Sequence, residues 1–158
     1  MIPTIGEMLA GSAARVPERR ALVCDDQELS YRELNARVNQ TVRGFLQQGI
    51  TGGDRAALLL HNRIELAVLL MGLARAGIVG IPLNYRLHPG ELSAVLHQSG
   101  ATVLFVGEEL ENVFTTVAPI PPAIRFVIRI KADSVKRSGF DTVCSSRPDR
   151  TLPALAGP

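Results

Sequence analysis

Asn84, Tyr85 and Arg86 are the residues of this chain whose types and placing best suit binding chemistry. They directly follow the apolar run 78–83, which is typical of a buried strand. Open α/β sheets bind ligands beyond the carboxyl ends of their parallel strands, and a fixed guanidinium beside a phenolic hydroxyl suits an anionic group. We therefore take these three residues as candidate cofactor-binding residues. A purely structural role in shaping the loop is the alternative that the sequence leaves open.

The three histidines are the side chains whose charge changes near neutral pH. His61 follows the apolar run 55–60, where a ligand could reach it, but we favour a turn or capping role before the next helix. His88 and His97 are nine residues apart across an expected loop and helix, and only Glu91 stands between them at a spacing that suits a metal ligand. We expect no metal site.

Glycines and serines indicate no further chemistry. A dinucleotide-binding turn needs its glycines between a strand and the following helix, whereas Gly77 closes an expected helix and Gly80 lies inside an expected strand. Ser30, Ser93 and Ser99 lack the Gly-x-Ser-x-Gly context of a hydrolase nucleophile. The residue patterns alone therefore identify no catalytic group.

Composition limits the class of protein. The 158 residues are 46% hydrophobic and 20% charged, which suits one domain with an apolar core and excludes a disordered chain. The 17 basic and 15 acidic residues are interspersed, so nucleic acid is not an expected partner. The longest apolar stretch, 66–73, is too short for a transmembrane segment. Two distant cysteines, Cys24 and Cys144, fit a reducing, cytoplasmic location.

The elements that would position the candidate residues begin with two helices and a hairpin. Capping-box spacing at Thr4 and at Ser30 predicts the starts of two helices. Between them, the turn 25–26 joins the expected strands 21–24 and 27–30. The second helix has one apolar face, made of Leu34, Val38, Val42, Phe45 and Leu46.

Downstream, strand and helix patterns alternate. The expected strands lie at 55–60, 78–83, 102–106 and 125–130, and the expected helices at 64–76, 91–98 and 108–117. Continuous apolar runs are typical of strands covered on both faces, and short connections with right-handed crossovers produce a parallel sheet. The expected fold class is therefore α/β, a parallel sheet with helices on both faces plus a small N-terminal hairpin.

Four sequence blocks follow one another in a characteristic order. They are Leu29-Ser30-Tyr31-Arg32-Glu33-Leu34-Asn35, Gly53-Asp54-Arg55-Ala56-Ala57-Leu58-Leu59-Leu60, Arg75-Ala76-Gly77 and Ile81-Pro82-Leu83-Asn84-Tyr85-Arg86-Leu87. In this order and spacing they resemble the opening segment of the adenylate-forming (AMP-binding) superfamily, which includes the acyl-CoA synthetases. The resemblance implies that the chain is an incomplete part of the adenylate-forming large domain.

The resemblance also implies an activity, the ATP-dependent activation of a carboxylate such as a fatty acid to an acyl-adenylate and then to acyl-CoA. The full-length family uses ATP, Mg and coenzyme A. Its triphosphate loop, rich in Ser, Thr and Gly, and its catalytic lysine have no counterpart in this sequence. We therefore expect no catalytic residue here, no cofactor for this chain alone, and a truncated acyl-CoA synthetase-like protein that is inactive by itself.

The expected domain organisation is an N-terminal subdomain over 1–130 and an irregular, poorly ordered tail over 131–158. An incomplete sheet would leave a strand edge or an apolar face uncovered. We therefore expect the chain to bind a complementary fragment or to associate with a second copy of itself through that surface. A non-catalytic interaction module, or one half of a split ligase, is the alternative function. A small α/β binding protein for a nucleotide or flavin also follows from the sheet, by analogy of fold alone.

Overall fold

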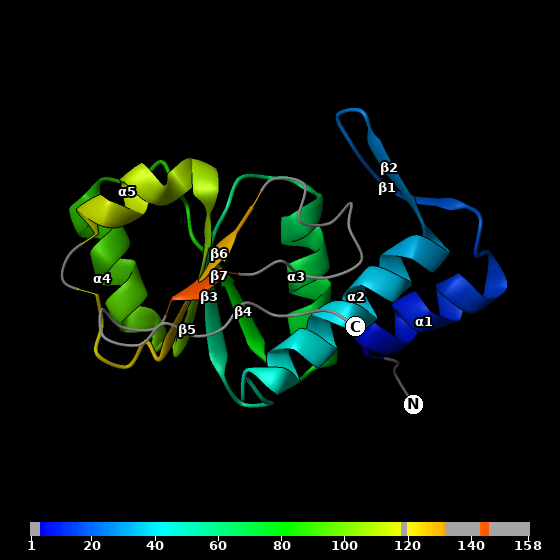
Figure 1. Ribbon diagram of the computed structural model, residues 1–158, viewed down its shortest axis with the longest axis horizontal. Helices are drawn as coiled ribbons and strands as arrows, with labels where there is room; N and C mark the ends of the chain where they lie inside the picture. Colours follow the sequence, from blue (N-terminus) through cyan, green and yellow to red (C-terminus); the bar gives the residue numbers. More distant parts are fainter. Residues whose placement is uncertain (1–3, 118–119, 132–142, 146–158) are drawn as a thin grey trace.

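The computed structural model describes residues 4–117, 120–131 and 143–145. Figure 1 shows a sheet in the middle of the molecule with helices on its two sides. The N-terminal hairpin stands apart from this sheet, beyond the helices of one side. The expected fold class is confirmed.

The N-terminal elements are α1 (Ile5–Arg15), β1 (Arg20–Cys24), β2 (Gln27–Ser30) and α2 (Tyr31–Gln47). Both predicted capping boxes are present, because Thr4 and Ser30 each exchange hydrogen bonds with the glutamate three residues later. Each box satisfies amide groups that a helix start otherwise leaves without partners. At the tip of the hairpin, Asp25 has a φ of 50°, the left-handed conformation that the tight turn demands.

The large sheet contains β3 (Arg55–Leu59), β4 (Val79–Pro82), β5 (Val103–Gly107), β6 (Phe126–Ile130) and β7 (Val143–Ser145). Its strand order is β4-β3-β5-β6-β7. The first four strands are parallel, and β7 runs antiparallel to β6. The strand β3 therefore lies inside the sheet, as its continuous apolar run predicts.

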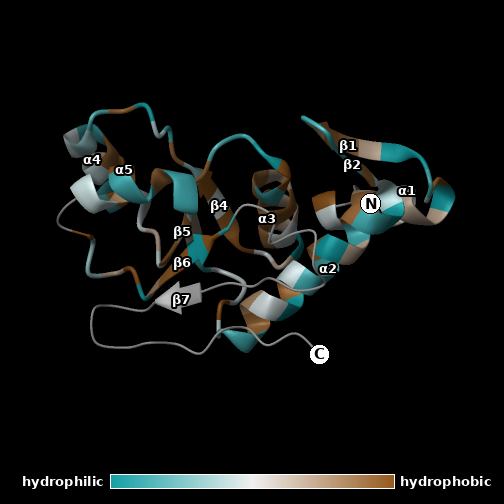
Figure 2. Ribbon diagram, turned by 45° about the horizontal axis from the view of Figure 1, so that its top comes forward, coloured by the Kyte–Doolittle hydropathy of each residue, from teal (hydrophilic) through white to brown (hydrophobic). Residues whose placement is uncertain are grey.

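Helices connect the parallel strands. They are α3 (Ile64–Arg75), α4 (Pro89–Ser99), the 3-10 turn η1 (Glu108–Leu110) and α5 (Glu111–Thr116). In Figure 1, α3 lies on one side of the sheet with α2 and α1 beyond it, and α4 and α5 lie on the other. Figure 2 shows that α3 is largely hydrophobic, whereas α2 is banded with hydrophilic and hydrophobic residues. This difference follows from position, since α3 packs between the sheet and α2.

The sheet has a core layer on each face, and a third apolar cluster lies among the hairpin and helices α1, α2 and α3. Leu58 and Phe105, which are partners in register, point to the side of α3, where they meet Leu73. Leu104, the residue before Phe105 on β5, points to the opposite side and meets Leu96 of α4. Each of these side chains is at most 1% exposed. Burial of one such side chain contributes about 1.5–3 kcal/mol, so the sheet and its two helical layers stabilise each other.

Two details of the expected core are wrong. The run 78–83 is not a buried strand, because β4 is at the edge of the sheet among the described residues and Val79 is 48% exposed. Leu46 is 57% exposed, although its spacing predicts the apolar face of α2. Thr41 is buried on that face instead, because Gly72 of α3 has no side chain and lets the two helices come close.

The expected irregular tail over 131–158 lies mostly outside the described residues. Within it, the structure describes β7, which pairs with β6 from Val127 to Arg129. Cys144 is therefore part of a strand rather than of an irregular stretch.

Candidate functional site

The carboxyl edge of the parallel sheet brings together two of the residues singled out by their sequence positions. His61 follows β3 and Tyr85 follows β4, and the neighbouring strands place the two rings with centroids 4.4 Å apart at an angle of 59°. Both side chains are half-buried. His61 is thus part of the same local cluster as the candidate segment, which its favoured capping role does not predict.

The candidate segment Asn84-Tyr85-Arg86 forms a turn between β4 and α4. Asn84 Oδ1 accepts a hydrogen bond from the Arg86 amide at 3.1 Å, so the asparagine shapes the turn. The Arg86 guanidinium lies 5.7 Å from the centroid of the Tyr85 ring, within the range of a cation–π interaction. Asn84 and Arg86 are exposed. The turn thus combines a structural asparagine with an exposed cation beside an aromatic ring.

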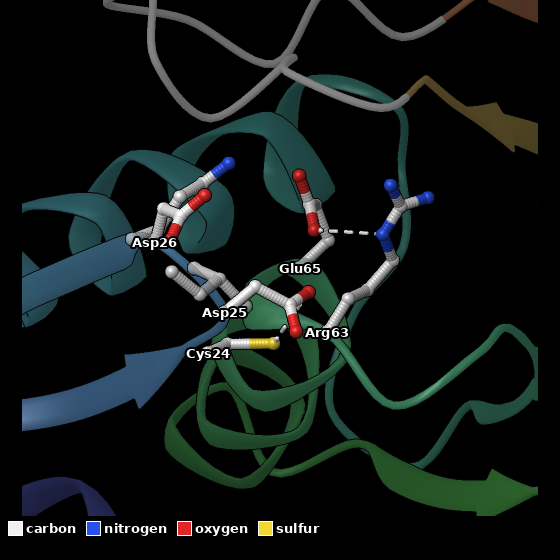
Figure 3. Close-up of a pocket in the computed structure, with 7 residues that line it drawn as sticks. Cys24, Asp25, Asp26, Arg63 and Glu65 are labelled. Atoms are coloured by element: carbon white, nitrogen blue, oxygen red, sulfur yellow. Dashed lines mark hydrogen bonds and ion pairs between the residues drawn. The ribbon is translucent and has the colours of Figure 1, made fainter.

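A separate pocket of about 300 Å³ lies between the hairpin tip and the start of α3. Figure 3 shows the side chains of Cys24 and Asp25 on one side of it and those of Arg63 and Glu65 on the other. The Cys24 Sγ atom lies 4.0 Å from Asp25 Oδ2 and 3.9 Å from the Asn62 carbonyl oxygen. Sequence reasoning missed this pocket.

The pocket is lined by one cation, Arg63, and by the carboxylates of Asp25, Asp26 and Glu65. Arg63 contacts Glu65 at 3.2 Å and Glu109, which follows β5, at 2.9 Å. Glu65 is only 3% exposed, so its carboxylate depends on this guanidinium. The sequence does hold a signal that could have found this pocket, a single acidic residue, Glu65, among the apolar positions of a buried helix. The pairing joins the starts of α3 and η1.

The other singled-out residues have structural roles. Ser30 caps α2, and His88 caps α4. His97 contacts the Ser93 carbonyl oxygen at 2.9 Å within α4. No group of three or more potential metal ligands occurs among the described residues.

Asp54 is the carboxylate with the richest set of partners, and it lies at the opposite, amino edge of the sheet. Burial by itself would raise the pKa of Asp54, but hydrogen bonds from Thr51, Thr102 and Arg125 lower it below the usual value. On β6, a hydrogen bond to Glu111 raises the pKa of Arg129. These pairs join strands and helices of the scaffold.

The fold and the loops at its carboxyl edge define an α/β protein with a largely parallel sheet whose candidate binding residues follow β3 and β4. The family model for AMP-binding enzymes matches residues 9–153, and the chain belongs to this family. The expected family is confirmed. The match continues past Ile130 into the segment that the sequence predicts to be a tail.

Two curated relatives are fatty-acid ligases. The medium/long-chain-fatty-acid–CoA/3-oxocholest-4-en-26-oate–CoA ligase of Mycobacterium marinum is 27% identical over an alignment of 158 positions that covers 96% of this chain and 29% of that protein. The long-chain-fatty-acid–CoA ligase FadD13 of Mycobacterium tuberculosis is 36% identical over 131 residues, which is 82% of this chain and 24% of that protein. The chain thus spans less than a third of the length of these relatives.

Solved structures agree with this assignment. The inhibitor-bound N-terminal domain of FACL13 from Mycobacterium tuberculosis superposes with a TM-score of 0.76 at 33% identity, over 85% of this chain and 35% of that one. A benzoate CoA ligase from Burkholderia xenovorans, at 19% identity and a TM-score of 0.72, shows the same fold. Among the described residues, none of the helices has the length and apolar character that a membrane crossing requires.

Proposed function

We propose that this chain supplies an amino-terminal part of the scaffold of an ATP-dependent acyl-CoA ligase, and that the 158 residues alone do not activate a carboxylate. The similarity to fatty-acid–CoA ligases over 82–96% of the chain carries the proposal. The expected inactivity has an electrostatic reason, the negative charge of the phosphate that is transferred. A transferring phosphate needs preorganised cations or amides around it, and the sequence holds no Ser/Thr/Gly-rich loop of the kind that cradles a triphosphate.

The substrate that we propose is a medium- or long-chain fatty acid, with ATP, Mg and coenzyme A as the cofactors of the complete enzyme. The activities for which the two relatives are named support this choice. Within this chain, we propose Asn84, Tyr85 and Arg86, together with His61, as the segment that contacts an anionic group of a substrate. Its exposed guanidinium and its place beyond the carboxyl end of β4 support the assignment.

An ATP–pyrophosphate exchange assay tests the activity in two arms. We expect the isolated 158-residue chain to give no exchange with medium- or long-chain fatty acids. In the second arm, this chain replaces the matching segment of FadD13 from Mycobacterium tuberculosis. We expect exchange from this chimera, because the two segments are 36% identical over 131 residues. Exchange by the isolated chain, or a folded chimera that gives none, would contradict the proposal.

The Arg86→Ala substitution in the same chimera tests the binding segment. Hydrogen bonds to charged groups contribute about 1.5–3 kcal/mol, so we expect substrate binding to weaken about tenfold or more. Arg43→Ala is the matched control, because Arg43 is an exposed arginine on α2. Equal effects of the two substitutions on substrate binding would mean that Arg86 does not contact the substrate.

The edge strand β4 favours a second candidate function, a module that docks with a complementary fragment. Among the described residues β4 pairs only with β3, and the exposed Val79 lies on it. Unpaired strand edges recruit further strands. Mixing the chain with FadD13 that lacks its matching segment distinguishes the two candidates. Restored exchange supports a split ligase, and stable binding without exchange supports a purely docking role. The cytoplasmic location stays a prediction, which cell fractionation would check.

A further inference from the structure

The buried carboxylate of Glu65 accepts no hydrogen bond from any residue that the structure describes. Glu65 is 3% exposed and lines the pocket between the hairpin tip and the start of α3. Arg63 meets it as an ion pair, with Nε 3.2 Å from Oε2, whereas the hydrogen bond of this guanidinium goes to Glu109. Buried polar groups in proteins are nearly always hydrogen-bonded, so this carboxylate points to a donor that enters the pocket from outside the chain.

The pocket also has an excess of negative charge. Asp25 and Asp26 line its hairpin side, and neither forms an ion pair with a residue of the described ranges. Two guanidinium groups attract Glu65, one from Arg63 and one from Arg37 of α2. Arg63 is itself shared with a second glutamate. The carboxylates therefore outnumber the cations, and the pocket favours a positively charged ligand.

The arrangement suits an organic cation better than a metal ion. Nowhere in the described part of the chain do three or more potential metal ligands gather, so these carboxylates do not converge on one point. A guanidinium is planar and has five N–H donors, so it can reach carboxylates that lie apart. Figure 3 shows Asp25 projecting from the hairpin and Glu65 from α3. The volume of about 300 Å³ is at the lower end of ligand pockets and suits a group of side-chain size.

We propose that this pocket binds a guanidinium group between the carboxylates of Asp25 and Glu65, either in a free small molecule or in an arginine side chain of another protein. The N–H groups of the ligand donate to the two carboxylates, and its methylene stem packs against Ile64, which lines the same pocket. Arg63 keeps its hydrogen bond to Glu109. The site does not include Asn84-Tyr85-Arg86, so it is independent of the proposed function.

An NMR titration of the full 158-residue chain with butylguanidinium tests the proposal. Butylurea is the matched compound, because it has nearly the same shape and no charge. We expect butylguanidinium to shift the backbone amide resonances of residues 24–27 and 63–65, and butylurea to bind about tenfold more weakly or less. Equal affinities for the two compounds, or shifts that bypass these residues, would overturn the proposal.

Three substitutions locate the bound group. Asp25→Asn removes a charge and keeps the hairpin turn, because asparagine tolerates the φ of 50° found there. It should weaken the binding of butylguanidinium about threefold, as expected for an exposed ion pair. Glu65→Gln should weaken it about tenfold, because this carboxylate is buried. Glu28→Gln is the control, since Glu28 is exposed on the same hairpin and does not line the pocket.

Wild-type affinity in the Asp25→Asn variant would overturn the proposal even if Glu65→Gln failed to fold. An equal loss in the Glu28→Gln variant would do the same, because it would indicate a general effect of charge. A short peptide with a single arginine distinguishes the two sources of the ligand. Tighter binding of this peptide than of butylguanidinium supports an arginine side chain of another protein, and weaker binding of the peptide supports a free guanidinium compound.

Discussion

Asp54, directly before β3, accepts a hydrogen bond from Arg125, directly before β6, at 2.5 Å, although β5 lies between the two strands. The same carboxylate oxygen accepts from Thr102, before β5, at 2.9 Å, and the other oxygen accepts from the Thr51 amide at 2.9 Å. One carboxylate therefore joins the starts of three neighbouring strands. It fixes the amino edge of the sheet, opposite the candidate site.

This arrangement predicts an acid-dependent loss of stability. The pKa of Asp54 is lower in the folded chain than in the unfolded one, where an aspartate has a pKa of about 3.9. A lowered folded-state pKa stabilises the fold above the unfolded value, and this contribution disappears as the pH falls below about 4. We expect Asp54→Asn to cost about 1–3 kcal/mol at pH 7 and to flatten the dependence on pH between about 5 and 3. Urea unfolding over this pH range measures both effects.

Asp26→Asn is the control for this measurement, because Asp26 is exposed at the hairpin tip. Its effect on the free energy of unfolding should stay within about 0.5 kcal/mol. An Asp54→Asn variant as stable as the Asp26→Asn variant would mean that the hydrogen bonds of Asp54 do not contribute to the free energy of unfolding.

The contact between α2 and α3 predicts that Gly72 tolerates no side chain. A Cβ atom at this position would lie 2.9 Å from Thr41 Cγ2 and 3.4 Å from a Phe45 ring carbon. Gly72→Ala should therefore destabilise the chain by about 1–3 kcal/mol, despite the higher helix propensity of alanine. Thermal unfolding followed by circular dichroism is a direct measurement.

Gly11→Ala provides the opposite case. Gly11 lies inside α1, and a Cβ atom there would meet nothing within 4 Å. This substitution should stabilise the chain by about 0.5–1 kcal/mol. If both glycine substitutions stabilised the chain, helix propensity rather than packing would decide the effect.

Arg75 is predicted to hold the three N-terminal helices together. Its guanidinium, at the end of α3, donates to the Gly6 carbonyl oxygen at 2.8 Å and to the side-chain oxygens of Asn35 and Asn39 at 2.9 and 2.5 Å. Burial lowers the pKa of Arg75, and the three oxygens that accept from its guanidinium are neutral. Arg75→Ala should cost about 1–3 kcal/mol in urea unfolding, because these acceptors lose their donor.

Arg43→Ala is the matched substitution for Arg75→Ala. Arg43 is exposed on α2, so the expected change stays within about 0.5 kcal/mol. Hydrogen exchange adds a local measurement. Amides of α1 should exchange faster in the Arg75→Ala variant, and unchanged exchange there would contradict the role that we assign to the guanidinium.

The contact between Tyr85 and His61 predicts a spectroscopic effect. Because the rings lie 4.4 Å apart, Tyr85→Ala should shift the His61 ring-proton resonances in an NMR spectrum, whereas Tyr85→Phe should keep them close to their original positions. Loss of the ring contact should also cost about 0.5–1.5 kcal/mol of stability. The His97 resonances provide an internal reference. Shifts of equal size at His97 would indicate a general rearrangement rather than a local contact.

Local patterns account for most of the elements. Local sequence determines the capping boxes at Thr4 and Ser30, the turn at Asp25 and the strand in the run 55–60. Each depends on interactions between residues a few positions apart, so the sequence alone predicts it. The family resemblance is likewise a property of order and spacing, and the match over residues 9–153 confirms it.

Tertiary structure alone decided which residues meet. No spacing in the sequence reveals that β4 lies at the edge, that Gly72 lets Thr41 replace Leu46 in the core, or that Arg63 pairs with Glu109. The same holds for His61 and Tyr85, because their contact depends on the pairing of β3 with β4. Side-chain periodicity specifies which face of an element is apolar, but the neighbours of that face depend on strand order and helix packing, which bring together residues far apart in the chain.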